Sequence, residues 1–107
     1  MPSYHKLVRD LIPEIIEQAG KVCTTRKVEK EEYEAALQNK LQEEVKEYLE
    51  AKTQEEAKEE LADVLEVISA LANIHGSSLQ DIDTLRIQKA KERGGFAKGI
   101  VLIEVKE

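Results

Sequence analysis

The apolar residues in the middle of the chain repeat with a helical period. Leu37, Leu41, Val45 and Tyr48 are separated by steps of four, four and three residues. This spacing places all four side chains on one face of a helix, where they can be buried against a neighbour. The pattern predicts a long amphipathic helix over residues 30–52.

A second long helix is predicted over residues 54–75. Thr53 and Glu56 have the spacing of a capping box, and Gly76 follows the last apolar position; these are the usual start and stop signals of a helix. The apolar positions of this helix form an arc wider than one neighbour needs: Leu61, Val64, Leu65, Val67, Ile68, Leu71 and Ile74. We therefore expect it to be contacted on two sides, within the domain or across an oligomer interface.

The shorter segments predict two more helices and two strands. A short N-terminal helix is expected around Pro13, which suits a first helical turn, and a third longer helix is expected from Ser78 to about Arg93. Residues 22–28 and 100–105 are rich in β-branched side chains and predict two strands that pair with each other. The predicted fold is mainly α: an antiparallel helical bundle with a short N-terminal helix and a small terminal β-ribbon.

Length and composition narrow the class of protein. The 107 residues are enough for one domain, residues 1–107, and the single cysteine rules out a disulfide framework. No apolar run has the length of a membrane span, and the N-terminus lacks the apolar core of a secretory signal, so we expect a cytoplasmic protein with no membrane partner. The net charge of −6 does not favour binding to nucleic acid.

The negative charge is concentrated in the two long predicted helices. Residues 29–66 contain 14 acids and 5 bases. At 100° per residue, Glu44 falls about 20° from Leu37, beside the apolar stripe, and Glu60 falls between Leu71 and Val67 on the next helix. An ionised carboxylate in such a place is costly unless it is paired or binds a cation.

Each of these glutamates has an acidic neighbour one turn further along: Glu44 has Glu47, and Glu60 has Asp63. Residues at i and i+3 share a helix face, so two antiparallel helices can present four carboxylates to one point. Four hard oxygen ligands suit Mg²⁺, with Mn²⁺ as a second possibility. The alternative is that some of these acids form ion pairs with Lys40, Lys58 or residues of a partner.

Basic side chains occur on both flanks of the acidic region. Arg86, Lys89 and Arg93 lie at steps of three and four and share one face of the third long helix, and Lys6 and Arg9 lie near the N-terminus. Arginine binds phosphate oxygens in a bidentate manner and lysine supplies a point charge. Next to a Mg²⁺ site, these five residues are candidates for binding the phosphates of a nucleotide.

These motifs resemble a known family. Glu43–Glu47 reads EExxE and Glu60–Asp63 reads ExxD, the ordered pair of the all-α nucleoside triphosphate pyrophosphohydrolase superfamily. That superfamily includes MazG, dimeric dUTPases and phosphoribosyl-ATP pyrophosphohydrolases. Lys89 and Arg93 resemble the basic motif of MazG domains, and the opening residues 6–13 and closing residues 93–96 are similar to a MazG-related branch of house-cleaning enzymes.

The resemblance implies a homodimer or homotetramer that hydrolyses a nucleoside triphosphate, normal or damaged, to the monophosphate and pyrophosphate. It places Glu44, Glu47, Glu60 and Asp63 at the metal-binding positions. Glu43 or Glu47 is the expected acceptor of the proton of the attacking water. One position departs from the family: Glu56 stands where MazG-type enzymes can carry a lysine that contacts phosphate.

Two other functions fit the same residues. A phosphoribosyl-ATP pyrophosphohydrolase would share the metal site and the chemistry and differ only in the pocket for base and ribose. A helical oligomerisation or interaction module without catalysis would use the wide apolar arcs to bind a partner. The module predicts no saturable effect of Mg²⁺ on stability, whereas the enzyme predicts one, because a ligand that binds only the native state stabilises it.

Overall fold

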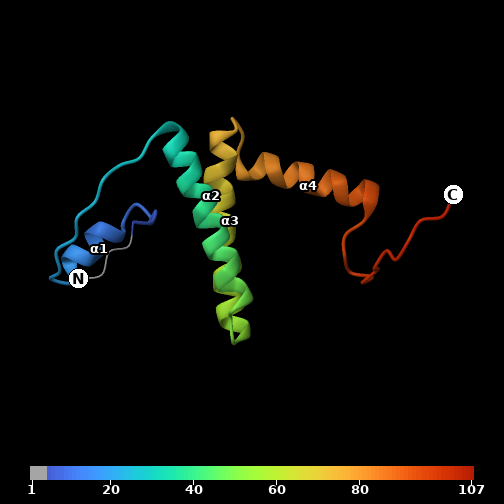
Figure 1. Ribbon diagram of the computed structural model, residues 1–107, viewed down its shortest axis with the longest axis horizontal. Helices are drawn as coiled ribbons and strands as arrows, with labels where there is room; N and C mark the ends of the chain where they lie inside the picture. The colour runs from blue at the N-terminus through green and yellow to red at the C-terminus, as the bar shows by residue number, and fades with distance from the viewer. Residues whose placement is uncertain (1–4) are drawn as a thin grey trace.

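The described part of the chain, residues 5–107 of a computed structural model, contains four helices. They are α1 (Ile12–Gln18), α2 (Lys30–Leu49), α3 (Gln54–Ile74) and α4 (Leu79–Arg93). α2 and α3 lie side by side as an antiparallel hairpin, and α4 leaves the end of α3 and projects away from it (Figure 1). The mainly α-helical fold and the positions of all four helices agree with the sequence prediction. None of these helices has both the length and the apolar character that crossing a membrane requires.

The N-terminal ends of α3 and α4 are defined by local hydrogen bonds. Thr53 Oγ1 accepts a hydrogen bond from the Glu56 amide at 3.1 Å, and Glu56 Oε2 accepts one from the Lys52 amide at 3.0 Å. This is the predicted capping box, with the glutamate reaching one residue further back than expected. Ser78 caps α4 in the same way, through the Asp81 amide at 3.1 Å. Glu56 therefore has a structural role in starting α3.

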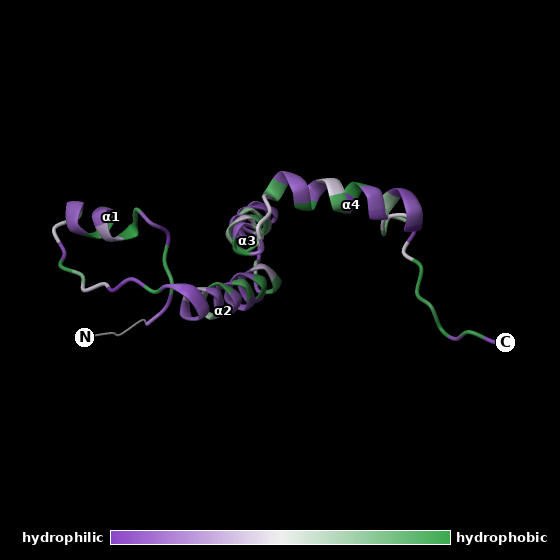
Figure 2. Cartoon of the chain, turned by 90° about the horizontal axis from the view of Figure 1, so that it is seen from above, coloured by the Kyte–Doolittle hydropathy of each residue, from purple (hydrophilic) through white to green (hydrophobic). Residues whose placement is uncertain are grey.

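The hairpin has a small interior. Leu37 of α2 and Val67 and Ala72 of α3 are the buried apolar residues of the described chain. Other members of the predicted apolar faces remain exposed, such as Leu61 at 47% and Leu65 at 52%. Figure 2 shows apolar stretches along α1, α4 and the C-terminal tail that no other element covers.

The chain is extended for its size. Its radius of gyration is 18.2 Å, whereas a compact domain of this length has one of about 13 Å. Its accessible surface is 9845 Å², against about 6,000 Å² for a compact monomer of this mass. Much apolar surface that folding usually removes from water is thus still available for contact.

The predicted β-ribbon is wrong for the single chain. Neither residues 22–28 nor residues 100–105 form a strand, and no strand occurs anywhere in residues 5–107. The reason is the direction of α4, which carries the C-terminal tail to the end of the molecule opposite α1 and the segment after it (Figure 1). A strand needs a neighbour for its backbone groups, and within one chain these two segments have none.

The cap of α3 supplies a direct test of the hairpin's local energetics. We expect Thr53→Ala to lower the free energy of unfolding by about 1 kcal/mol, because the Glu56 amide loses its acceptor. The matched control is Thr84→Ala, since Thr84 lies in the interior of α4 and its hydroxyl donates only to the carbonyl of Gln80. Urea unfolding measures both changes. Equal losses in the two variants would contradict a capping role for Thr53.

Candidate functional site

Three of the four predicted metal ligands meet between α2 and α3. Glu44 and Glu47 lie one turn apart on α2, and Glu60 faces them from α3. One carboxylate oxygen from each residue lies within 4.8 Å of the others. The antiparallel hairpin creates this meeting point, because it places the C-terminal half of α2 beside the N-terminal half of α3.

Glu44 is the buried member of this acidic cluster, which we define as Glu44, Glu47 and Glu60. Its exposed fraction is 6%, and its Oε1 contacts Lys40 Nζ at 3.2 Å. Glu44 Oε2 and Glu60 Oε2 are buried and have no hydrogen-bond partner in the described structure. Buried carboxylate oxygens without partners are costly, so the cluster has an unmet need for a cation or a proton.

The pKa of Glu44 reflects this environment. Burial raises it above the ordinary value of a glutamate, and the neighbouring carboxylate of Glu47 raises it further, while Lys40 acts in the opposite direction. One lysine therefore does not compensate for burial beside another acid. A second positive charge close to Oε2 would favour the ionised form.

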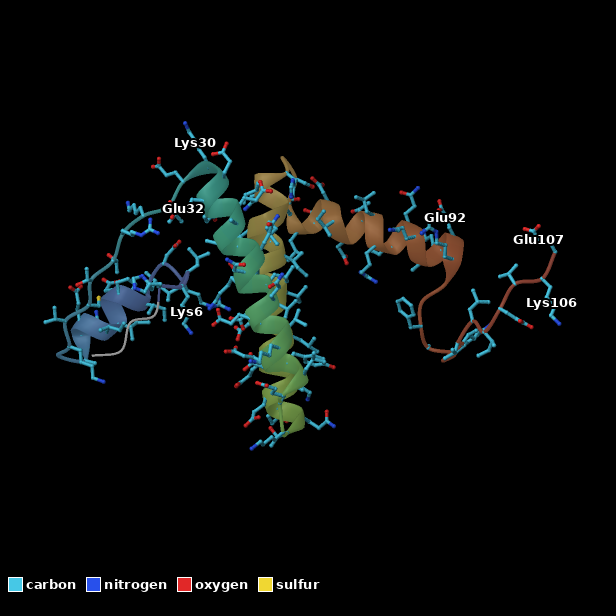
Figure 3. All side chains as sticks on the ribbon, viewed as in Figure 1. Lys6, Lys30, Glu32, Glu92, Lys106 and Glu107 are labelled. Atoms are coloured by element: carbon cyan, nitrogen blue, oxygen red, sulfur yellow. The ribbon has the colours of Figure 1, made fainter. Side chains whose placement is uncertain are left out.

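Glu43 lies outside the cluster and is already paired. Its Oε1 accepts hydrogen bonds from Lys6 Nζ at 3.0 Å and Lys40 Nζ at 3.5 Å. Burial acts to raise the pKa of Glu43, but the hydrogen bond from Lys6 and the charge of Lys40 outweigh it, so the pKa is lowered. The pKa of Lys6 is raised by the same hydrogen bond. Figure 3 shows Lys6 before α1, on the side that faces α2.

Asp63, the fourth predicted ligand, is turned toward the N-terminal segment. Arg9 donates a hydrogen bond from its Nη2 to Asp63 Oδ1 at 2.6 Å. The two side chains remain 56% and 38% exposed, and an ion pair of this kind contributes about 0–1 kcal/mol. Asp63 is thus one helical turn from Glu60 but is held away from the cluster by a weak contact.

The basic row of α4 is not part of this arrangement in one chain. Arg86, Lys89 and Arg93 are exposed on a helix that packs only against α3, and no hydrogen bond or ion pair of the described residues joins them to the cluster. Arg86 pairs with Asp83 of its own helix at 2.6 Å. Of the five predicted phosphate-binding residues, only Lys6 and Arg9 lie beside the acids.

Lys40 is the residue that the site assignment from sequence left out. It contacts both Glu43 and Glu44 and is largely buried, with 18% of its side chain exposed. Its spacing of three and four residues before two acids is the signal for such a contact, and the ion-pair alternative named it. The other lysine of that alternative, Lys58, lies on the surface, where its Nζ is 3.9 Å from Glu55 Oε1.

Comparisons of the chain with protein-family models, curated proteins and solved structures find no match. The features that bear on function are therefore those of the chain itself. Among them, the acidic cluster stands out because it combines burial, like charges and carboxylate oxygens without partners. Hard oxygen ligands in this arrangement can hold a divalent cation such as Mg²⁺.

The acidic cluster predicts that Mg²⁺ stabilises the folded protein. We expect the melting temperature to rise with the Mg²⁺ concentration, because an ion that binds only the native state adds about 2.7 kcal/mol at a concentration of about one hundred times its Kd. Glu60→Gln is expected to remove the response while leaving the metal-free protein at least as stable, since it also relieves repulsion between like charges.

Glu59→Gln is the matched control, because Glu59 neighbours Glu60 but is exposed and outside the cluster. Thermal melts of the three proteins across a Mg²⁺ titration measure the effect. A Glu60→Gln variant that retains the full response would contradict the assignment.

Proposed function

We propose that the chain is a Mg²⁺-dependent nucleoside triphosphate pyrophosphohydrolase of the MazG-like, all-α type. The observation that most supports this proposal is the buried carboxylate of Glu44. This carboxylate lies beside those of Glu47 and Glu60, and its Oε2 has no hydrogen-bond partner. The resemblance of the EExxE and ExxD motifs supplies the reaction, and the α2–α3 hairpin would be the centre of that family's antiparallel bundle. A soluble cytoplasmic enzyme is the corresponding expectation.

The charges around the site support a divalent ion. Five carboxylates gather here, from Glu43, Glu44, Glu47, Glu60 and Asp63, against the three cationic side chains that contact them. These three are Lys6, Arg9 and Lys40. Two negative charges remain when all groups are ionised, which one divalent cation would neutralise. Mg²⁺ is favoured by the all-oxygen ligand set, and Mn²⁺ fits the same ligands.

Glu44, Glu47 and Glu60 would hold the ion, and Asp63 would join them by exchanging Arg9 for the metal. When bound, Mg²⁺ supplies positive charge that withdraws electrons from the phosphate oxygens of the substrate. The ion pair that Asp63 gives up is exposed and weak, so the exchange costs little. The arginine released by it would remain next to the substrate phosphates.

Glu47 is the better candidate for the general base. Glu43 is held by two lysines that lower its pKa, whereas Glu47 is exposed at the edge of the cluster, beside the carboxylate of Glu44. Water adds to phosphorus at the anhydride between the α and β phosphates, and that P–O bond breaks. Glu47 accepts the proton of the water, and the products are a nucleoside monophosphate and pyrophosphate.

Lys6 and Arg9 would bind phosphate oxygens from the N-terminal side of the site. The remaining positive charge, Arg86, Lys89 and Arg93, would come from α4 of a second copy, because α4 projects away from its own hairpin (Figure 1). The large exposed surface supports a homodimer or homotetramer. Phosphate ligands from two chains would then surround each set of acids.

The two alternative functions differ in what they explain. A non-catalytic interaction module accounts for the exposed apolar faces but gives no reason for carboxylates with unpaired oxygens inside the hairpin. A phosphoribosyl-ATP pyrophosphohydrolase accounts for both and remains the closest competitor. Turnover of phosphoribosyl-ATP, compared with that of nucleoside triphosphates, separates the two enzymes.

The activity is tested by a substrate panel. With Mg²⁺ present, we expect pyrophosphate release from at least one member of a panel of normal, deaminated and oxidised nucleoside triphosphates that includes dUTP. Glu60→Gln and Glu47→Gln should each lower kcat by at least about 100-fold, while Glu59→Gln should retain it. Pyrophosphate release in a coupled assay is the measurement, and a wholly inactive wild-type protein would refute the proposal.

Contribution of α4 from a second copy predicts complementation between two inactive variants. Glu60→Gln lacks a metal ligand and Arg93→Ala lacks a phosphate ligand, so each is expected to be nearly inactive alone. In a dimer mixed at random, one site in each mixed pair is intact, and activity should recover to about a quarter of the wild-type value. Mixing Glu60→Gln with Glu47→Gln is the control, because both acids come from the same hairpin and no intact site results.

A further inference from the structure

Two segments of the chain have the sequence of strands but no partner strand, although side chains of the first contact nearby residues: Cys23 donates to the Pro13 carbonyl at 3.8 Å and Arg26 pairs with Glu32 at 2.7 Å. Residues 22–28 include Val22, Thr24 and Thr25, and Val22 is 94% exposed. Residues 100–105 are isoleucine, valine, leucine, isoleucine, glutamate and valine, and their apolar side chains are 76–85% exposed. No backbone hydrogen bond involves either segment within the described chain.

The C-terminal tail, residues 100–105, exposes five apolar side chains to water. In an extended conformation Val101, Ile103 and Val105 share one face, and Ile100 and Leu102 share the other with Glu104. Figure 2 shows this apolar stretch extending beyond α4 without any covering element. A contiguous exposed apolar segment of this kind is typical of an interaction site.

The two segments cannot meet in this conformation of a single chain. Residues 22–28 follow α1 at one end of the molecule, and the tail lies beyond α4 at the other end (Figure 1). The molecule measures 63 Å along its longest axis. α4 alone has a length of about 22 Å at 1.5 Å per residue, and it separates the tail from the hairpin.

The occupant that fits the tail is a second copy of this chain. We propose that residues 100–105 of one copy pair as a β-strand with residues 22–28 of another, so that the β-ribbon forms between chains. Each copy carries one segment of each kind, and a two-fold axis therefore produces two identical ribbons that satisfy both. The proposal concerns assembly and holds whether or not the acidic cluster hydrolyses nucleotides.

Surface area and charge support a second copy. The chain exposes about 3,800 Å² more than a compact monomer of its mass would, and obligate interfaces bury about 2,000–5,000 Å² in total. Residues 22–28 carry two bases and no acid, whereas residues 100–105 carry one acid and no base. Pairing of the two segments thus brings together opposite net charges.

Cys23, the one cysteine of the chain, lies in the first of these segments and makes the pairing measurable by cross-linking. Residues 100–105 are replaced by cysteine one at a time in the full chain, and the proteins are oxidised and separated on a denaturing non-reducing gel. Pairing predicts disulfide-linked dimers at tail positions opposite Cys23, because facing residues in a sheet have Cα atoms close enough for a disulfide. Glu92→Cys, an exposed position on α4, is the control and should not cross-link to Cys23.

A mixture of two single-cysteine proteins identifies the chains involved. Wild-type protein is co-refolded with a Cys23→Ala variant that carries a tail cysteine at the position of strongest cross-linking. A disulfide-linked heterodimer is the expected product. An intramolecular disulfide in the two-cysteine chain would place the ribbon within one chain, and dimers of the Cys23→Ala variant alone would indicate tail-to-tail pairing; either result overturns the proposal.

Hydrogen exchange supplies a measurement that does not depend on thiol reactivity. In the full chain, the amides of residues 22–28 and 100–105 should exchange at least about ten times more slowly than unstructured amides. Removal of residues 100–107 should abolish the protection of residues 22–28. Fast exchange of both segments in the oligomer would refute strand pairing.

Discussion

The arrangement of the site depends on one buried group, the carboxylate of Glu44 between α2 and α3. Helical phase places this acid beside Leu37, so closing the hairpin over the apolar stripe also buries a charge. Lys40 compensates for one oxygen, and the other oxygen is buried without a hydrogen-bond partner in a carboxylate that lies close to those of Glu47 and Glu60. The hairpin thus accepts an electrostatic cost that an apolar residue at position 44 would avoid. The proposed metal site would give that cost a functional reason.

The same hairpin has little apolar interior to offset the cost. Leu37, Val67 and Ala72 are its buried apolar residues, and much of the apolar arc on α3 faces water. An arc this wide is the pattern of a helix with neighbours on two sides, and α2 supplies only one of them. Further copies of the chain would supply the others, and burial of Glu44 would then be connected to assembly into an oligomer. Each added neighbour would both stabilise α3 and lower the access of water to the cluster.

The helices could be predicted from sequence because their determinants are local. Apolar spacing, the caps at Thr53 and Ser78 and the stop at Gly76 act within a few residues, and all four helices occur where these signals place them. The strands could not be predicted in the same way, because a β-rich segment becomes a strand only when another segment lies beside it. Residues 22–28 and 100–105 have the composition of strands and lie at opposite ends of the chain.

The candidate site, like the fold, could be predicted only where local helical periodicity determines it. Helical phase was sufficient to bring Glu44, Glu47 and Glu60 together, since each position follows from the hairpin and the 3.6-residue period. Asp63 shares that phase, but its side chain is oriented by Arg9, 54 residues away in the sequence. Periodicity carries no information on a contact of that separation, nor on the direction of α4 and its basic row.

The distribution of charge along the chain explains why the site would need more than one segment. Residues 29–66 carry the acids on one continuous hairpin, and the bases that could balance a bound polyanion lie before and after it. The N-terminal segment reaches the acids of its own chain through Lys6 and Arg9. The C-terminal bases cannot do so, because α4 points away from the hairpin. A triphosphate bound between two chains would meet acids and a metal from one and arginines from the other, and its presence would therefore strengthen the association of the two.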